Sequence, residues 1–60
     1  MTRTLPEALE ALEREMILDA LKSSRGNMVK AARALGISER VMGLRVKRLG
    51  IAPKRFRTSV

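Results

Sequence analysis

The 60-residue sequence contains neither cysteine nor histidine. Disulfides are therefore excluded, and a zinc site would be exceptional, because carboxylates alone would have to bind the metal. The same absences leave no plausible acid–base constellation, so we predict that the chain is not an enzyme and uses no metal or cofactor. A chain of this size buries only about 60% of its unfolded surface. Without disulfides or metals, dimerisation is the remaining common source of stability.

Long apolar runs are missing as well. No segment approaches the roughly 18 apolar residues that cross a bilayer. The N-terminal region also lacks the apolar core of a signal peptide and carries Glu7, Glu10, Glu13 and Glu15 instead. These features predict a cytoplasmic protein with no membrane-spanning segment, and the lack of cysteine fits a reducing compartment.

Acidic residues are nearly absent from the second part of the chain. Residues 20–60 hold eleven lysines and arginines against a single acid, Glu39, a net charge of +10. Residues 1–19 hold two arginines against five acids, a net charge of −3. Such asymmetry favours a polyanionic partner, either nucleic acid or an anionic membrane surface. A basic surface that is merely solvated is the alternative.

The sequence shows apolar residues at helical spacing, and residues that start and end helices. Thr4 and Glu7 form a capping box around Pro6, which predicts a helix from residue 5 to about residue 24. Its first half has one apolar stripe, and residues 16–21 are apolar around nearly the whole circumference. Asn27 and Ser38 are good N-caps, and Gly36 and Gly50 good stops, so helices are expected at 28–35 and 39–49. The expected inner-face residues are Ala31, Ala32, Leu35, Met42, Val46 and Leu49.

The predicted fold is therefore all-α, with three helices and no strand. We assign residues 1–52 to one domain, with Ile51 packing back on the helices. Residues 53–60 are expected to form a basic flexible tail.

The last two predicted helices are joined by Gly36-Ile37-Ser38. A turn this short makes the helices cross steeply, which is typical of a helix-turn-helix whose second helix enters the major groove of DNA. A structural αα-corner has a similar pattern. The basic outer face of helix 39–49, which carries Arg40, Lys47 and Arg48, favours DNA binding.

Residues 5–51 resemble the Fis-type helix-turn-helix domain that ends bacterial sigma-54-dependent activators of the nitrogen regulatory protein C class. The matching residues are Leu9, Glu15, Ile17, Ala20, Leu21, Gly26, Asn27, Ala31, Ala32, Leu35, Gly36, Ile37, Met42, Val46, Leu49, Gly50 and Ile51. Residues 38–45 are most similar to nitrogen-fixation activators of the NifA type. The sequence departs from the Fis pattern at Gly43 and Leu44, where Fis has basic residues, and at Val29, where Fis often has a hydroxyl.

This resemblance implies a nucleoid-associated bacterial protein that binds double-stranded DNA as a homodimer. The implied DNA site is an inverted repeat of the form TGT…ACA upstream of a promoter. It also implies a longer protein whose ATPase domain contacts sigma-54 RNA polymerase. The present sequence has no Walker-type glycine-rich loop.

Roles in DNA binding follow from position on helix 39–49. Arg40 is expected to read guanine, with a phosphate contact or a merely solvated charge as the alternatives. Leu44 is expected to contact a thymine methyl, and Val41 is the third base-reading candidate. Gly43 permits close approach to the groove or is a tolerated defect. For Arg45, an intramolecular ion pair rivals a DNA contact. The expected contacts to the DNA backbone are Asn27, Lys30, Ser38, Arg45, Lys47 and Arg48.

The expected dimer interface is the apolar stripe of the first helix, formed by Leu5, Leu9, Leu12 and Met16. The two short helices are too small to cover this stripe, although packing on the chain's own core is the alternative. Two other functions remain open: a free-standing nucleoid or architectural DNA-binding protein of Fis type, and a dimerising protein-interaction module.

Overall fold

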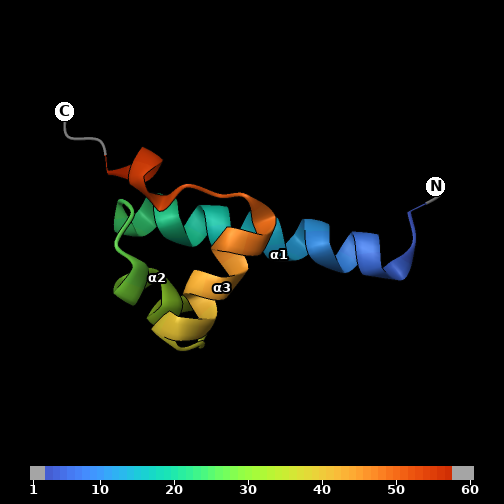
Figure 1. Ribbon diagram of the computed structural model, residues 1–60, viewed down its shortest axis with the longest axis horizontal. Coiled ribbons are helices and arrows are strands. Elements are labelled where there is room, and N and C mark those ends of the chain that lie inside the picture. The colour runs from blue at the N-terminus through green and yellow to red at the C-terminus, as the bar shows by residue number, and fades with distance from the viewer. Residues whose placement is uncertain (1–2, 58–60) are drawn as a thin grey trace.

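The computed structural model describes residues 3–57. Three α-helices follow one another, α1 (Leu5–Ser24), α2 (Met28–Leu35) and α3 (Glu39–Leu49), and a short 3-10 helix, η1 (Pro53–Phe56), comes last (Figure 1). No strand occurs among the described residues. The predicted all-α, three-helix fold is confirmed, and the three α-helices have the bounds that the caps indicate.

Side-chain caps explain where each helix begins. The backbone N–H of Glu7 donates to Thr4 Oγ1 over 3.4 Å, and the Thr4 N–H donates to the Glu7 carboxylate over 3.0 Å, which completes the capping box. Asn27 Oδ1 accepts from the N–H of Lys30, and Ser38 Oγ accepts from the N–H of Val41. Each cap satisfies a backbone donor that the first turn of a helix leaves free.

The turn between α2 and α3 is short because Gly36 ends α2 in the left-handed region, at φ 74°. A residue with a Cβ would be strained there. The next residue, Ile37, donates its N–H to Ala32 over 3.0 Å and packs its side chain against the core. The chain then enters α3 at Ser38, so the turn between the two helices is three residues long, with an apolar residue packed beneath it.

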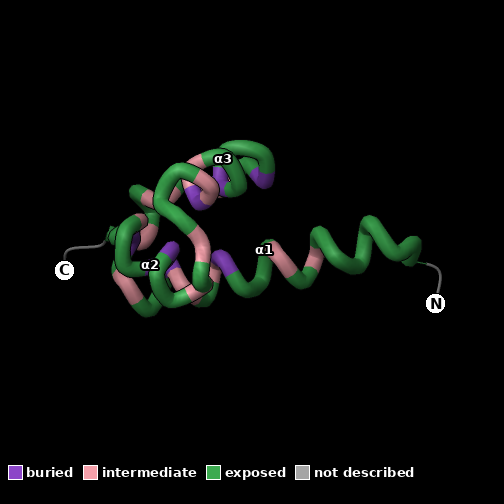
Figure 2. Tube along the Cα trace, turned by 90° about the horizontal axis from the view of Figure 1, so that it is seen from below, coloured by how far each residue is buried: buried purple, intermediate pink, exposed green. Residues whose placement is uncertain are grey.

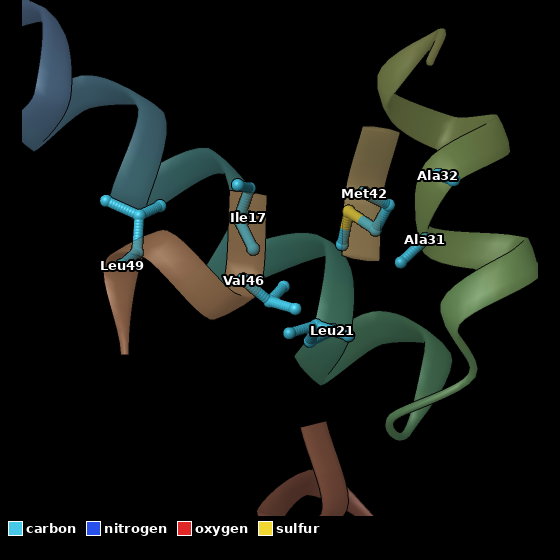
Figure 3. Packing of buried hydrophobic residues seen from close by; sticks show 7 residues of the cluster. All are labelled: Ile17, Leu21, Ala31, Ala32, Met42, Val46 and Leu49. Atoms are coloured by element: carbon cyan, nitrogen blue, oxygen red, sulfur yellow. The ribbon is translucent and has the colours of Figure 1, made fainter. Parts of the chain in front are cut away.

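Seven buried side chains form the core, and all three helices contribute (Figure 3). They are Ile17, Leu21, Ala31, Ala32, Met42, Val46 and Leu49. Leu21 and Met42 are fully buried. The two alanines let α2 lie close to its neighbours, because their side chains take little room. The predicted inner faces of α2 and α3 are confirmed, with Leu35 only half-buried.

The first half of α1 extends beyond the rest of the molecule (Figures 1 and 2). Its apolar side chains are exposed: Leu5 by 71%, Leu9 by 57%, Leu12 by 54% and Met16 by 50%. The stripe therefore does not pack on the chain's own core. An exposed apolar surface on a protruding helix is typical of a site that binds another protein surface.

The tail differs from the sequence-based expectation over residues 53–57. Pro53–Phe56 form a 3-10 turn that packs on α1, with Phe56 against the core. The aromatic ring of Phe56 gives this segment an apolar contact that a purely basic tail would lack. Residues 58–60, also predicted to belong to the flexible tail, lie outside the described residues. Ile51 packs against the core, as predicted.

Candidate nucleic-acid interface

The outer face of α3 is basic and points away from the core. Arg40, Leu44 and Lys47 fall within one arc at 100° per residue and are all exposed, Leu44 by 63%. Arg40 and Lys47 have no ion-pair partner within residues 3–57. The charge on this face is therefore not compensated by the described part of the chain, as a surface that binds a polyanion requires.

Two further candidates, Val41 and Gly43, flank this arc and are half-buried. A Cβ added to Gly43 would meet no protein atom within 4 Å. No packing contact among the described residues therefore requires glycine at this position, although glycine costs a helix interior about 1 kcal/mol relative to alanine.

Asn27 and Ser38 use their side-chain oxygens as helix caps. The distances are 3.0 Å from Lys30 N to Asn27 Oδ1 and 3.1 Å from Val41 N to Ser38 Oγ. Capping fixes each side chain but leaves the Asn27 amide protons and the Ser38 hydroxyl proton free of these bonds. Both residues retain donors for a phosphate oxygen.

The start of α2 and the start of α3 face a common polar hollow of about 480 Å³. Its lining includes Asn27 from the α2 cap, Glu39 from α3, and the arginines Arg25 and Arg57. Lys30 is exposed one turn into α2. The structure thus places Asn27, a predicted contact to the DNA backbone, beside the start of α3. Arg25 and Arg57, which line the same hollow, are not in the predicted set of DNA-backbone contacts.

Arg45 and Arg48, both predicted to contact the DNA backbone, are paired with Glu13 of α1. Arg48 Nη2 lies 2.6 Å from Glu13 Oε1, and Arg45 Nη1 donates to Oε2 of the same carboxylate. The ion pair considered for Arg45 is therefore present. Glu13 was not among the predicted site residues. Glu13 lies four residues from both Leu9 and Ile17, which places it on the apolar side of α1. A charged residue on that side was the sequence signal that could have identified Glu13 as a partner for the arginines of α3.

An apolar groove of about 360 Å³ lies between the first half of α1 and the α2–α3 turn. Three of the four predicted dimer residues line it, Leu9, Leu12 and Met16, whereas Leu5 does not. Leu35 and Ile37 form the opposite wall, with Glu13 and Arg45 at the polar margin. The groove thus joins the exposed stripe of α1 to the helix-turn-helix.

The sequence profile described as "Bacterial regulatory protein, Fis family" matches residues 8–53, which run from within α1 through the whole of α2 and α3. The chain belongs to this family. The Fis-family domain is 47% identical over 53 residues, 88% of this chain, to the nitrogen fixation protein AnfA of Azotobacter vinelandii. It is 43% identical over 56 residues, 87% of the chain, to the nitrogen fixation protein VnfA of the same organism. The response regulator protein PilR of Pseudomonas aeruginosa is 45% identical over 47 residues, 78% of the chain.

The chain spans only about a tenth of the length of these relatives, 10% of AnfA and 11% of the other two. No solved structure matches it. Within residues 3–57 of the Fis-family domain, no helix is long and apolar enough to cross a membrane. The same residues contain no cluster of three or more acidic side chains suited to a metal ion.

Proposed function

We propose that this Fis-family domain binds DNA sequence-specifically within a longer sigma-54-dependent transcriptional activator, and that it binds as a dimer to an inverted repeat. The activator class is supported by the resemblance to the nitrogen regulatory protein C class. Two relatives are named for nitrogen fixation, which favours promoters of that process. The domain's own role in this proposal is binding, with no catalytic step.

The observation that carries the proposal is the exposed, uncompensated basic face of α3, positioned by a short turn after α2. An α-helix of 11 residues is about 16 Å long, and the major groove, about 12 Å wide, admits a helix. In a helix-turn-helix the start of the second helix reaches the base edges. Arg40 lies in the first turn of α3, and its guanidinium fits the N7 and O6 acceptors of guanine.

Leu44 and Val41 supply apolar contacts beside Arg40. A leucine that is 63% exposed in the middle of a basic face has no packing role within the described chain. The methyl group of thymine is the apolar feature that the major groove presents. Gly43, on the same side of α3, lets the backbone of the helix approach the groove more closely than alanine would.

The proposed contacts to the DNA backbone lie around these base-reading residues. Lys47 continues the exposed face, and Asn27, Lys30 and Ser38 present donors near the starts of α2 and α3. Such contacts fix the register of a protein on DNA without reading its sequence. Arg45 and Arg48 can join them through the N–H groups that Glu13 leaves free, because a guanidinium has five donors.

Dimerisation would cover the stripe of Leu5, Leu9, Leu12 and Met16. A two-fold contact pairs the same surface from both copies, so the α1 stripe of one copy would pack on that of the other. The two α3 helices would then face successive turns of the major groove, about 34 Å apart. This geometry explains why the expected site is an inverted repeat.

Contact with sigma-54 RNA polymerase is assigned to an ATPase domain elsewhere in the longer protein. In this account the present domain places that ATPase near its promoter. The resemblance supports this assignment of DNA binding to the present domain and of polymerase contact to the ATPase domain.

A salt-resolved binding titration tests the proposed function. A duplex is first selected from a randomised pool with the wild-type domain, and binding to it is compared with binding to a scrambled duplex. We expect binding to the selected duplex to be at least about 10³-fold tighter, and both affinities to fall with added salt. Equal affinities would favour a nucleoid or architectural protein. No binding at low salt would favour a protein-interaction module.

A further inference from the structure

We propose that Glu13 is a positioning residue that sets the orientation of α3 relative to α1, and through it the half-site spacing that the dimer accepts. This inference rests on the proposed function, because it concerns how two α3 helices are placed on one DNA site. It assigns a specificity-determining role to a residue that does not itself contact DNA.

The carboxylate of Glu13 makes two contacts with α3, one from each oxygen. Oε1 faces Arg48 Nη2 at 2.6 Å, and Oε2 accepts from Arg45 Nη1. The two arginines are three residues apart, so they lie on one side of α3. A single carboxylate that holds two points on one side of a helix opposes rotation of that helix about its axis.

The neighbouring residue of α1 adds a third tie to the same end of α3. Arg14 Nη1 donates to the backbone carbonyl oxygen of Leu49 over 2.8 Å. That carbonyl is in the last turn of α3, where no partner exists within the helix. Glu13 and Arg14 therefore bind the C-terminal half of α3 from one turn of α1.

These polar contacts are important for the orientation of α3 because the backbones of α1 and α3 do not pack closely. α2 packs against both helices, whereas the backbones of α1 and α3 have few close contacts, and Figure 2 shows α3 standing apart from α1. Their direct connection consists of core side chains, Ile17 and Leu21 of α1 with Val46 and Leu49 of α3 (Figure 3), and of the contacts made by Glu13 and Arg14. Apolar packing is not directional, whereas these charge-assisted hydrogen bonds fix an angle.

Glu13 also lies where the free arm of α1 meets the packed half. The stripe that would form the dimer ends at Met16, and burial begins at Ile17. Glu13 lies one turn before this boundary, between Leu12 and Met16, and lines the groove with Leu9, Leu12 and Arg45. In a two-fold dimer, the distance and angle between the two α3 helices would depend on α1 and on this junction.

Pairing with Glu13 leaves both arginines able to bind phosphate. The side chains of Arg45 and Arg48 remain 46% and 59% exposed, whereas that of Glu13 is 22% exposed. Each guanidinium has donors beyond the one directed at Glu13. The carboxylate thus holds the inner edge of each arginine while the outer edge faces solvent.

The test measures spacing preference with Glu13→Gln and the matched control Glu15→Gln. Both substitutions add one unit to the net charge on α1, but Glu15 is exposed and has no ion pair within the described chain. The probes are the selected duplex and versions with its central spacer lengthened or shortened by one or two base pairs. Each added pair moves a half-site by about 3.4 Å and rotates it by roughly 35°.

We expect wild type and Glu15→Gln to lose at least about tenfold in affinity when the spacer changes, because a rigid dimer matches one spacing. Glu13→Gln is expected to bind the selected duplex about tenfold more weakly and to lose less than about threefold with the altered spacers. Glu13→Asp keeps the charge but is one methylene shorter, so it should show the same loss of spacing preference. Circular dichroism of each variant confirms that it is folded.

A spacing preference in both Glu13 variants equal to that of wild type would overturn the inference while leaving the proposed function intact. Tighter binding of Glu13→Gln to every duplex, with the spacing preference unchanged, would also overturn it, because Glu13 would then act only as a repulsive charge. If the wild-type domain shows no sequence preference at all, the proposed function itself fails. The outcomes therefore separate the two claims.

Discussion

Gly26 lies directly against the carbonyl oxygen of Pro53, so close that a Cβ on residue 26 would stand 2.7 Å from that oxygen. The same Cβ would be 2.9 Å from Cγ of Arg57. The α1–α2 turn and η1 are therefore in contact because residue 26 has no side chain. This contact brings Arg57 to the hollow at the start of α2.

Gly26→Ala is expected to destabilise the domain more than Gly36→Ala. Both glycines have positive φ, 82° and 74°, which costs an alanine about 1–2 kcal/mol. Only residue 26 adds a clash with backbone, because a Cβ at residue 36 meets nothing within 4 Å. We expect Gly26→Ala to cost at least about 1 kcal/mol more in the free energy of unfolding, as steric strain in a packed site does. Urea denaturation followed by circular dichroism gives both values, and equal losses would show that η1 does not pack on Gly26.

Gly43→Ala is expected to change stability and DNA binding in opposite directions. Open space surrounds the position, so alanine should stabilise the helix by about 0.5–1 kcal/mol through its higher propensity. If the backbone of α3 approaches the groove there, the added methyl should weaken binding to the selected duplex by about fivefold or more. Thermal unfolding and a binding titration of one variant measure both quantities. Unchanged binding would identify Gly43 as a tolerated defect.

Leu12→Glu is expected to abolish dimerisation and weaken DNA binding. Leu12 is 54% exposed in the middle of the stripe, and a carboxylate in a two-fold contact would be buried opposite its own copy. Sedimentation equilibrium, with and without the selected duplex, reports the oligomeric state. Val29→Glu is the control for the oligomeric state alone, because Val29 is similarly exposed, by 44%, but lies on α2 beside the proposed DNA contacts. A wild-type domain that stays monomeric at high concentration and on DNA would contradict the proposed interface.

Local features of the sequence were enough to predict the helices. Thr4, Asn27 and Ser38 cap by bonding to residues three positions away, and Gly36 and Gly50 end helices through their own conformation. These interactions lie within a few residues, so their signals are readable in the chain. The inner face of α3 followed for the same reason, since Met42, Val46 and Leu49 share one side at helical spacing.

Contacts between distant segments were not predictable in this way. The pairing of Glu13 with Arg48 joins positions 35 residues apart, and it depends on how α1 and α3 cross. Likewise, the packing of η1 depends on Gly26 and on Phe56, which separately looked like a turn residue and a tail residue. Tertiary geometry decides which of several basic residues have an ion-pair partner among residues 3–57. That is why Arg40 and Lys47 differ from Arg45 and Arg48.

The most direct test of the account compares Arg40→Ala with Lys47→Ala on selected and scrambled duplexes across a range of salt concentrations. Arg40 is placed to read a base, so its loss should cost about 1–3 kcal/mol on the selected duplex and much less on the scrambled one. Lys47 is placed to contact phosphate, so its loss should weaken both complexes by similar factors and lower the salt slope by roughly one unit. Equal losses for Arg40→Ala on the two duplexes would contradict base reading by the exposed face of α3.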